Sequence, residues 1–86
     1  MAKVTIYTRA FCPFCTRALR MLSGKGADFT EIDAGMDAAK RGEMISKSGG
    51  ARTYPQIFVG DLHIGGFDDM NALDKRGQLD KLLEAA

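Results

Sequence analysis

Residues 3–25 read KVTIYTRAFCPFCTRALRMLSGK, and this stretch decides the fold. At its start, residues 3–7 alternate apolar with polar side chains and are rich in β-branched types, which predicts a strand. Cys12 and Cys15 follow, and the proline between them suits the first turn of a helix, where its missing N–H is not needed. Apolar residues then recur at helical spacing as far as a pair of nearby glycines, which predicts a helix over residues 13–25. The chain therefore begins as a strand and a helix with two cysteines at their junction.

The rest of the chain carries the same kinds of pattern. Strands are expected over residues 29–32, 56–59 and 62–64, and helices over residues 37–48 and around 70–83, the last broken at Gly77. The order of elements is then β-α-β-α-β-β-α. A strand–helix–strand crossover is right-handed and makes its two strands parallel, and the final hairpin extends the same sheet. We therefore predict an α/β fold with a four-stranded mixed sheet flanked by helices, in a single domain spanning residues 1–86.

Length, composition and charge exclude several classes of protein. The chain has 86 residues, of which 45% are hydrophobic and 27% charged, as in ordinary globular domains. Its net charge is +1, from 12 basic and 11 acidic residues, so nothing electrostatic favours nucleic acid or an anionic membrane as partner. Apolar runs are about three residues long, as at residues 57–59, and no apolar signal segment follows Met1. We expect a cytoplasmic protein.

The cysteine pair is the most informative feature of the chain. Two cysteines are too few for the disulfide framework of a small secreted domain, so in a reducing compartment a close pair is expected to do chemistry. Cys12 falls at the predicted helix start, where free N–H groups and the helix dipole stabilise a thiolate, and Arg9 and Arg17 add positive charge nearby. Cys15 lies one turn further along. We infer that Cys12 is the catalytic nucleophile and that Cys15 resolves the disulfide that Cys12 forms.

A structural interpretation of the same pair is half of a zinc site, or two buried thiols. Structural zinc sites need four ligands, and the one other soft ligand in the chain is His63. Three ligands do not close such a site without a second chain, so no metal is expected. His63 alternates with Leu62 and Ile64 on a predicted strand, which favours a place on the sheet surface.

Three motifs make the chain similar to a known family. Tyr7-Thr8-Arg9 precedes Cys12-Pro13-Phe14-Cys15, residues 50–58 read GARTYPQIF, and residues 63–69 read HIGGFDD. In this order the motifs resemble those of a glutaredoxin of the small bacterial dithiol type, and the match covers essentially the whole chain. The resemblance implies the thioredoxin fold and a site for glutathione.

The resemblance also implies which residues bind glutathione. Arg9 stands where the family carries a basic residue and would pair with the glycine carboxylate, whereas taken alone it is an ordinary solvated arginine. The Tyr54-Pro55 step corresponds to the family's cis-proline, before which the backbone pairs with the cysteinyl part of glutathione; the plainer interpretation is a proline that starts an edge strand. Asp68 and Asp69 follow a glycine turn that suits the γ-glutamyl group, although either is also a good helix cap. The full set implied is Arg9, Phe14, Thr53, Tyr54, Pro55, Gly66, Phe67, Asp68 and Asp69.

Apolar side chains outside these motifs are expected in the core. This expectation covers the five methionines and most of the five phenylalanines. Phe14 is the exception, because it lies between the cysteines and is expected beside the substrate. Phe14 stands where many dithiol glutaredoxins carry tyrosine. Tyr54 replaces the small aliphatic residue that is common before the proline, and it adds bulk and a hydroxyl at the rim of the site.

The function that the resemblance implies is glutathione-dependent thiol–disulfide exchange. Cys12 alone is expected to remove glutathione from glutathionylated proteins, and Cys12 with Cys15 to reduce protein disulfides. The expected partners are glutathione, glutathionylated or disulfide-containing proteins and, indirectly, glutathione reductase. We expect a monomer that needs no metal.

Two other functions fit the same cysteine motif. In related proteins two chains bridge an iron–sulfur cluster with one active-site cysteine each and two glutathione thiols, and Cys12 would be the ligand here. Pro13 stands against this alternative, because the cluster-binding members carry glycine or serine at that place. An absorption spectrum of anaerobically purified protein would reveal a cluster. The third option is a thioredoxin-like reductase served by a flavoenzyme, which leaves Arg9, the Tyr54-Pro55 step and the Asp68-Asp69 turn without a ligand.

Overall fold

One four-stranded sheet forms the centre of the protein, as described for residues 1–85 by a computed structural model. Its strands are β1 (Lys3–Thr8), β2 (Asp28–Asp33), β3 (Gln56–Val59) and β4 (Leu62–Gly65), in the order β2-β1-β3-β4. β1 runs parallel to β2 and antiparallel to β3, and β3 pairs antiparallel with β4. The predicted mixed sheet, with its parallel crossover and closing hairpin, is confirmed.

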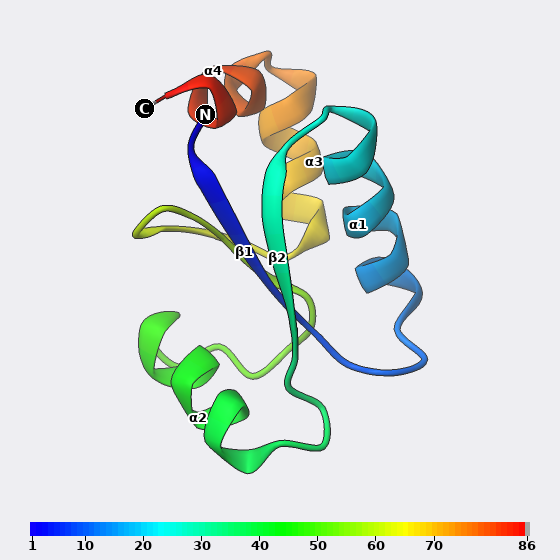
Figure 1. Ribbon diagram of the computed structural model, residues 1–86, viewed down its shortest axis with the longest axis vertical. Coiled ribbons are helices and arrows are strands. Elements are labelled where there is room, and N and C mark those ends of the chain that lie inside the picture. The colour runs from blue at the N-terminus through cyan, green and yellow to red at the C-terminus, as the bar shows by residue number, and fades with distance from the viewer. Residues whose placement is uncertain (86) are drawn as a thin grey trace.

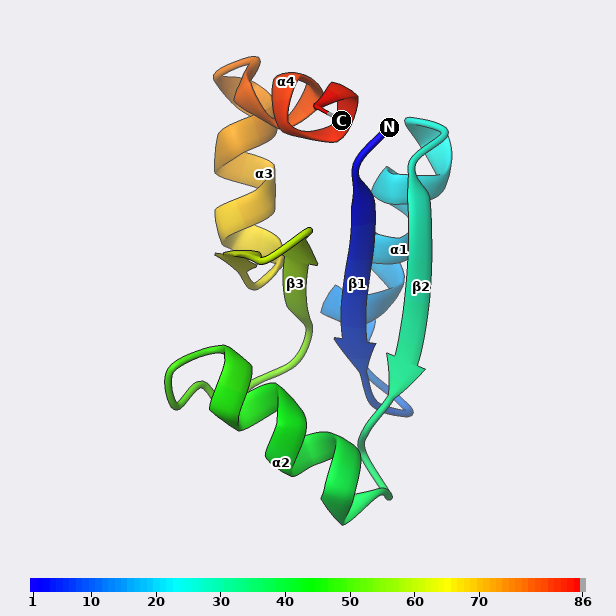
Figure 2. The ribbon, with the colours of Figure 1, turned by 60° about the vertical axis from the view of Figure 1, so that its left-hand side comes forward.

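Helices cover both faces of this sheet. α1 (Pro13–Gly24) and α3 (Phe67–Lys75) pack on one face and α2 (Ala38–Lys47) on the other, as Figures 1 and 2 show. α4 (Gln78–Glu84) follows Gly77, whose φ of +71° is a left-handed conformation that glycine adopts without steric cost. The predicted break at Gly77 is confirmed, so the last helical segment is two helices. None of the helices within residues 1–85 is long and apolar enough to cross a membrane.

The core is divided by the sheet into two apolar clusters. Successive residues of a strand point to opposite faces, so Ile6 belongs to one cluster and Tyr7 to the other. The larger cluster consists of Val4, Ile6, Ala18, Leu22, Ile57, Val59, Met70, Leu79 and Leu83. The smaller cluster, on the α2 face, consists of Tyr7, Ala34, Met44 and Phe58. The two clusters fix β1 between α1 and α2, and the cysteine loop begins where β1 ends.

Not every methionine and phenylalanine lies in this core. Met70 is fully buried, but Met1 is exposed, and Phe11 and Met36 are each 98% exposed. For these three residues the prediction is wrong. Met1 lies at the chain end, and the other two lie in the loops that follow β1 and β2, where no helix or sheet face covers them. Phe14 is half exposed, as predicted.

Tyr7 is a fully buried tyrosine on the α2 face, and its hydroxyl donates a hydrogen bond to Glu43 Oε2 at 2.5 Å. Burial, followed by the hydrogen bond to Glu43 and the charge of its carboxylate, raises the pKa of Tyr7 from 10.0 to about 12. Because the folded value is the higher one, this group stabilises the fold fully below pH 10. The contribution is lost as the pH rises through about 12.

The titration of Tyr7 can be observed directly, because the chain has only two tyrosines. In a Tyr54→Phe variant we expect the tyrosinate absorbance to appear with a midpoint near pH 12. Far-UV circular dichroism at each pH reports whether the fold is intact during the titration. A midpoint near pH 10 with an intact fold would show that Tyr7 does not make this hydrogen bond in solution.

Candidate active site

The two cysteines stand at the junction of β1 and α1, as predicted. Cys12 is the N-cap of α1, with extended backbone, and its sulfur accepts a hydrogen bond from the Cys15 N–H at 3.2 Å. Pro13 occupies the first turn of the helix. Cys12 and Cys15 form a disulfide with their Cα atoms 5.2 Å apart, and they are 8% and 3% exposed. A backbone donor therefore points at the Cys12 sulfur from the start of a helix, which is the arrangement that stabilises a thiolate.

The Tyr54-Pro55 step faces this sulfur from the loop before β3. Its peptide bond is cis, as the resemblance implies, and the Tyr54 carbonyl oxygen lies 3.9 Å from Cys12 Sγ. The Tyr54 side chain points away from the groove, and its hydroxyl donates to the Ala34 carbonyl oxygen at 3.3 Å. The Tyr54 hydroxyl, expected at the rim of the site, therefore lies away from the groove. The Tyr54 ring packs against the smaller cluster on the α2 face.

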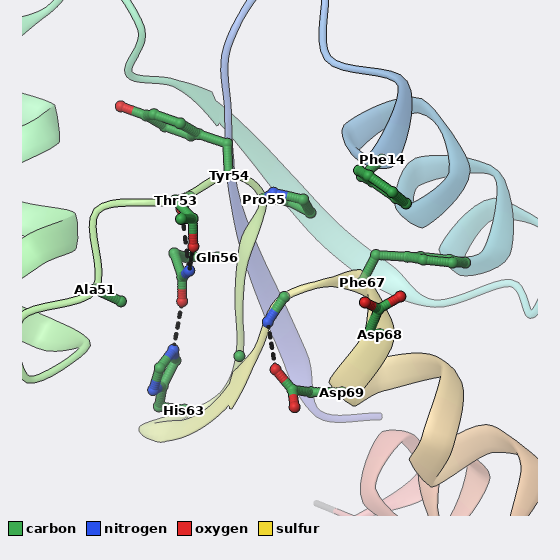
Figure 3. A pocket seen from close by; sticks show the side chains of 12 residues that line it. Phe14, Ala51, Thr53, Tyr54, Pro55, Gln56, His63, Phe67, Asp68 and Asp69 are labelled. Atoms are coloured by element: carbon green, nitrogen blue, oxygen red, sulfur yellow. Dashed lines mark hydrogen bonds between the residues drawn. The ribbon is translucent and has the colours of Figure 1, made fainter.

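A groove of about 410 Å³ runs from the Tyr54-Pro55 step to the start of α3. Its walls are Phe14, Ala51, Thr53, Tyr54, Pro55, Gln56, His63, Gly65, Gly66, Phe67, Asp68 and Asp69 (Figure 3). The structure thus brings together in one groove every residue that the resemblance assigns to glutathione except Arg9. We call this the Tyr54 groove.

At the α3 end of the groove the two aspartates have different surroundings. Gly66 is the N-cap of α3, and its N–H donates to Asp69 Oδ2 at 3.0 Å (Figure 3). Gly65 has φ +117°, and a Cβ at this position would collide with the Asp69 carboxylate. Asp69 therefore caps the start of α3, which is the alternative to a contact with the γ-glutamyl group that the sequence left open. Asp68 is exposed at the same helix start and lines the groove.

Phe14 and Phe67 form the apolar wall of the groove opposite Tyr54. Their ring centroids are 6.3 Å apart, and the guanidinium carbon of Arg17 lies 5.5 Å from the centroid of Phe14. A cation over the face of an aromatic ring is attracted to it, so Arg17 holds positive charge at this wall. Phe67 is half-buried, between the exposed Phe14 and the core of the larger cluster.

Sequence reasoning missed a buried polar chain that supports the groove floor. Gln56 is 3% exposed, and its Nε2 donates to the carbonyl oxygen and to Oγ1 of Thr53 at 3.0 and 3.1 Å. Its Oε1 is therefore the acceptor for His63 Nε2 at 2.6 Å, which carries the proton (Figure 3). The His63 ring packs on Phe58. The sequence signal for these hydrogen-bonded side chains was a polar glutamine, Gln56, at the start of the otherwise apolar strand β3.

Arg9 is the one predicted glutathione residue that the structure places outside the Tyr54 groove. It lines a second hollow of about 410 Å³, together with both cysteines and Phe11. Its guanidinium carbon lies 5.9 Å from the centroid of the Tyr54 ring. Arg9 therefore stands at the far side of Tyr54, at the end of the groove opposite to α3. We call this second space the Phe11 hollow.

No group of three or more histidine, cysteine, aspartate or glutamate side chains gathers into a metal-binding cluster within residues 1–85. His63, the third ligand of the zinc interpretation, is bonded to Gln56. The cysteines are bonded to each other. The site thus described is a bonded cysteine pair beside an open groove.

Comparisons with known proteins agree with this geometry. The family profile described as glutaredoxin matches residues 4–64. Glutaredoxin 3 of Escherichia coli (strain K12) is 55% identical over 84 residues, which cover 98% of this chain and all of the relative. The solution structure of a glutaredoxin from Brucella melitensis has a TM-score of 0.84 and 51% identity, covering 98% of this chain and 90% of that one. The crystal structure of a buckwheat glutaredoxin–glutathione complex has a TM-score of 0.83 and 25% identity, covering 93% and 74%. These likenesses confirm the predicted thioredoxin fold.

Proposed function

This chain belongs to the glutaredoxin family, and from that premise we propose how its own residues carry out the reaction. It is a dithiol glutaredoxin, a glutathione-dependent thiol–disulfide oxidoreductase whose redox pair is Cys12 and Cys15. Our proposal is that glutathione binds in the Tyr54 groove, with its sulfur at Cys12. The observation that carries it is the gathering of the residues from the three motifs into one groove beside the cysteine pair.

Each part of glutathione has a counterpart along this groove. Tyr54 lies just before β3, so its backbone is outside the sheet and free to pair with the cysteinyl part of the tripeptide. The start of α3, with its unpaired N–H groups, suits the γ-glutamyl carboxylate, and Asp68 suits its ammonium group. Arg9, whose guanidinium carbon lies 5.9 Å from the centroid of the Tyr54 ring, would pair with the glycine carboxylate at the opposite end. The buckwheat complex, solved with glutathione, supports a site of this kind.

The reaction with a glutathionylated protein needs only Cys12. Its thiolate attacks the glutathione sulfur, the protein thiolate leaves with the electron pair of the old disulfide, and glutathione stays on Cys12. A second glutathione thiolate then attacks this mixed disulfide and releases glutathione disulfide together with the Cys12 thiolate. The Cys15 N–H, at 3.2 Å from the Cys12 sulfur, stabilises the negative charge at the start and again at the end of the cycle.

The reaction with a protein disulfide uses both cysteines. Cys12 forms a mixed disulfide with one sulfur of the substrate, and Cys15 attacks Cys12 and releases the substrate as a dithiol. The Cα separation of 5.2 Å permits the resulting Cys12–Cys15 bond. Two glutathione molecules return the pair to thiols and leave as glutathione disulfide, which glutathione reductase recycles. We place this cycle in the cytoplasm, in a monomer whose single domain spans residues 1–86 and uses no metal.

Turnover of a small glutathione mixed disulfide tests the proposal. The assay contains reduced glutathione, glutathione reductase and NADPH, and it follows NADPH consumption with and without the protein. We expect a rate well above the uncatalysed background that saturates with glutathione. A rate equal to the background would remove the proposed function.

Arg9→Ala and Asp68→Ala are expected to raise the KM for glutathione by about five- to thirtyfold each, because each removes a charge-assisted contact at a partly exposed site. The measurement is a glutathione titration in the assay above. Arg20→Ala and Asp28→Ala are matched controls, since both residues are exposed and lie outside the groove and the hollow. If the Arg9 and Asp68 variants behave like these controls, the two ends of the glutathione site are wrongly assigned.

A further inference from the structure

Two hollows of similar size, the Tyr54 groove and the Phe11 hollow, lie near the disulfide. Glutathione is proposed to bind in the Tyr54 groove, and the Phe11 hollow is still without a proposed ligand. The Tyr54 groove is lined by the glutathione residues, whereas the Phe11 hollow includes Arg9, Phe11, Cys12, Cys15, Leu19 and Glu31. Both cysteines line the second hollow. A molecule that occupies it is therefore in contact with the atoms that exchange disulfides.

Phe11 is placed there at a cost to the fold. Its side chain is 98% exposed, so it adds nothing to the core. Its φ is +56°, the only positive value at a residue other than glycine within residues 1–85, and bulky residues rarely adopt this conformation. A strained backbone at a functional loop that presents an exposed aromatic ring indicates a binding role. Exposed aromatic side chains are typical anchors of protein–protein contacts.

The hollow continues from the point where glutathione would end. Arg9, proposed to hold the glycine carboxylate, is part of the wall of the Phe11 hollow. Glutathione stops at that carboxylate, so it does not reach Phe11. A polypeptide bound in the same direction has further residues after this point, and they enter the hollow. This step rests on the proposed function, because it uses the orientation of glutathione.

The loop after β2 extends the same apolar surface on the other side of Arg9. A Cβ at Gly35 would lie 2.6 Å from Arg9 Cβ, so the two loops touch, and Met36 next to Gly35 is 98% exposed. Figures 1 and 2 show the β1–α1 and β2–α2 loops side by side at this end of the molecule. The rim is polar, because Thr16 and Glu31 line the hollow and are exposed. Glu31 Oε2 accepts a hydrogen bond at 2.7 Å from Oγ1 of the buried Thr8. This surface has apolar side chains on both sides of the charged Arg9 and a polar rim, a combination that suits the binding of a peptide segment.

We propose that the Phe11 hollow binds the polypeptide of protein substrates, on the C-terminal side of the cysteine that forms the mixed disulfide with Cys12. An apolar side chain second after that cysteine would pack on Phe11, because the first residue after it takes the place of the glycine of glutathione. Phe11 is thus a specificity residue that distinguishes protein substrates from one another.

Thiol exchange on a Cys15→Ser variant tests this inference at equilibrium. The Cys12–glutathione mixed disulfide is incubated with a peptide thiol. The disulfide bond between Cys12 and glutathione breaks, and a disulfide bond between Cys12 and the peptide sulfur forms. Glutathione leaves as a thiol with the proton of the peptide thiol. Two peptides are compared, with cysteine and glycine followed by leucine or by serine. Mass spectrometry gives the two exchange constants.

We expect the leucine peptide to be favoured by about five- to tenfold, as expected for partial burial of its side chain. Phe11→Ser should bring the ratio close to one, and Phe11→Tyr should keep it. Leu62→Ser is the matched control, because Leu62 is 52% exposed and outside both hollows.

Equal constants for the two peptides, or an unchanged ratio in Phe11→Ser, would overturn the inference. So would a dimer in sedimentation that Phe11→Ser dissociates, since a second copy would then occupy the surface. Failure of the proposed function would be a separate result. In that case the parent protein would not turn over the small glutathione mixed disulfide.

Discussion

A Cys12→Ser variant is expected to lose all thiol–disulfide exchange, with rates at the uncatalysed background. A serine hydroxyl is barely ionised at neutral pH and is a poor nucleophile toward sulfur, whereas the Cys12 sulfur receives a hydrogen bond from the Cys15 N–H that favours its thiolate. The measurements are turnover of a glutathione mixed disulfide and reduction of a protein disulfide. Both should fall together, because both begin with attack by Cys12.

The Cys12→Ser substitution is a clean test because it should preserve the helix start. Cys12 is the N-cap of α1, and serine is among the best N-cap residues. Loss of activity with the same thermal unfolding midpoint as the reduced parent protein, in which the Cys12–Cys15 bond is also absent, would therefore reflect the lost thiolate. Activity retained by this variant would place the nucleophile elsewhere.

A Cys15→Ser variant is expected to separate the two activities. Removal of glutathione from a protein needs only Cys12 and a second glutathione, so this activity should persist, and it should be no slower because the side reaction to the Cys12–Cys15 disulfide is absent. Reduction of a protein disulfide by the two-cysteine route should collapse, since no neighbouring thiol resolves the mixed disulfide. Mass spectrometry should find the substrate trapped on Cys12.

The opposite pattern would reverse the assignment of roles. If Cys15→Ser loses deglutathionylation while Cys12→Ser keeps it, Cys15 is the nucleophile, and the argument from the helix start fails with it. The exposures of the two cysteines do not decide this, because both are nearly buried in the disulfide. The position of Cys12 as the N-cap does distinguish them.

Most of the fold could be predicted because its signals are local. The alternation of apolar residues in β1, the proline at the start of α1 and the break at Gly77 each act within a few residues, and the structure confirms all three. The exposure of Phe11 and Met36 could not be predicted in this way. Apolar character favours burial, but only the arrangement of neighbouring elements decides whether a loop residue is covered.

The supporting chain from His63 through Gln56 to Thr53 was also beyond local reasoning. A histidine on a strand is equally consistent with a solvated surface or with a buried hydrogen bond. Its partner lies on the neighbouring strand, and the register of β3 with β4 decides which side chains meet. The glutathione set was obtained from the resemblance to a family. Residue spacing would not have assembled it.

By itself, the sequence determined the chemistry of this protein: a thiol pair three residues apart, with Cys12 at a helix start, because a cap and its helix are neighbours in the chain. The tertiary structure alone decided what the thiols face. Tyr54 is 42 residues from Cys12 along the chain, and its carbonyl oxygen reaches 3.9 Å from the sulfur because β1 and β3 pair in the sheet. The same packing places Arg9 beyond Tyr54 and opens the Phe11 hollow beside it. Contacts between distant segments follow from burial of the whole apolar core, which no single stretch of sequence encodes.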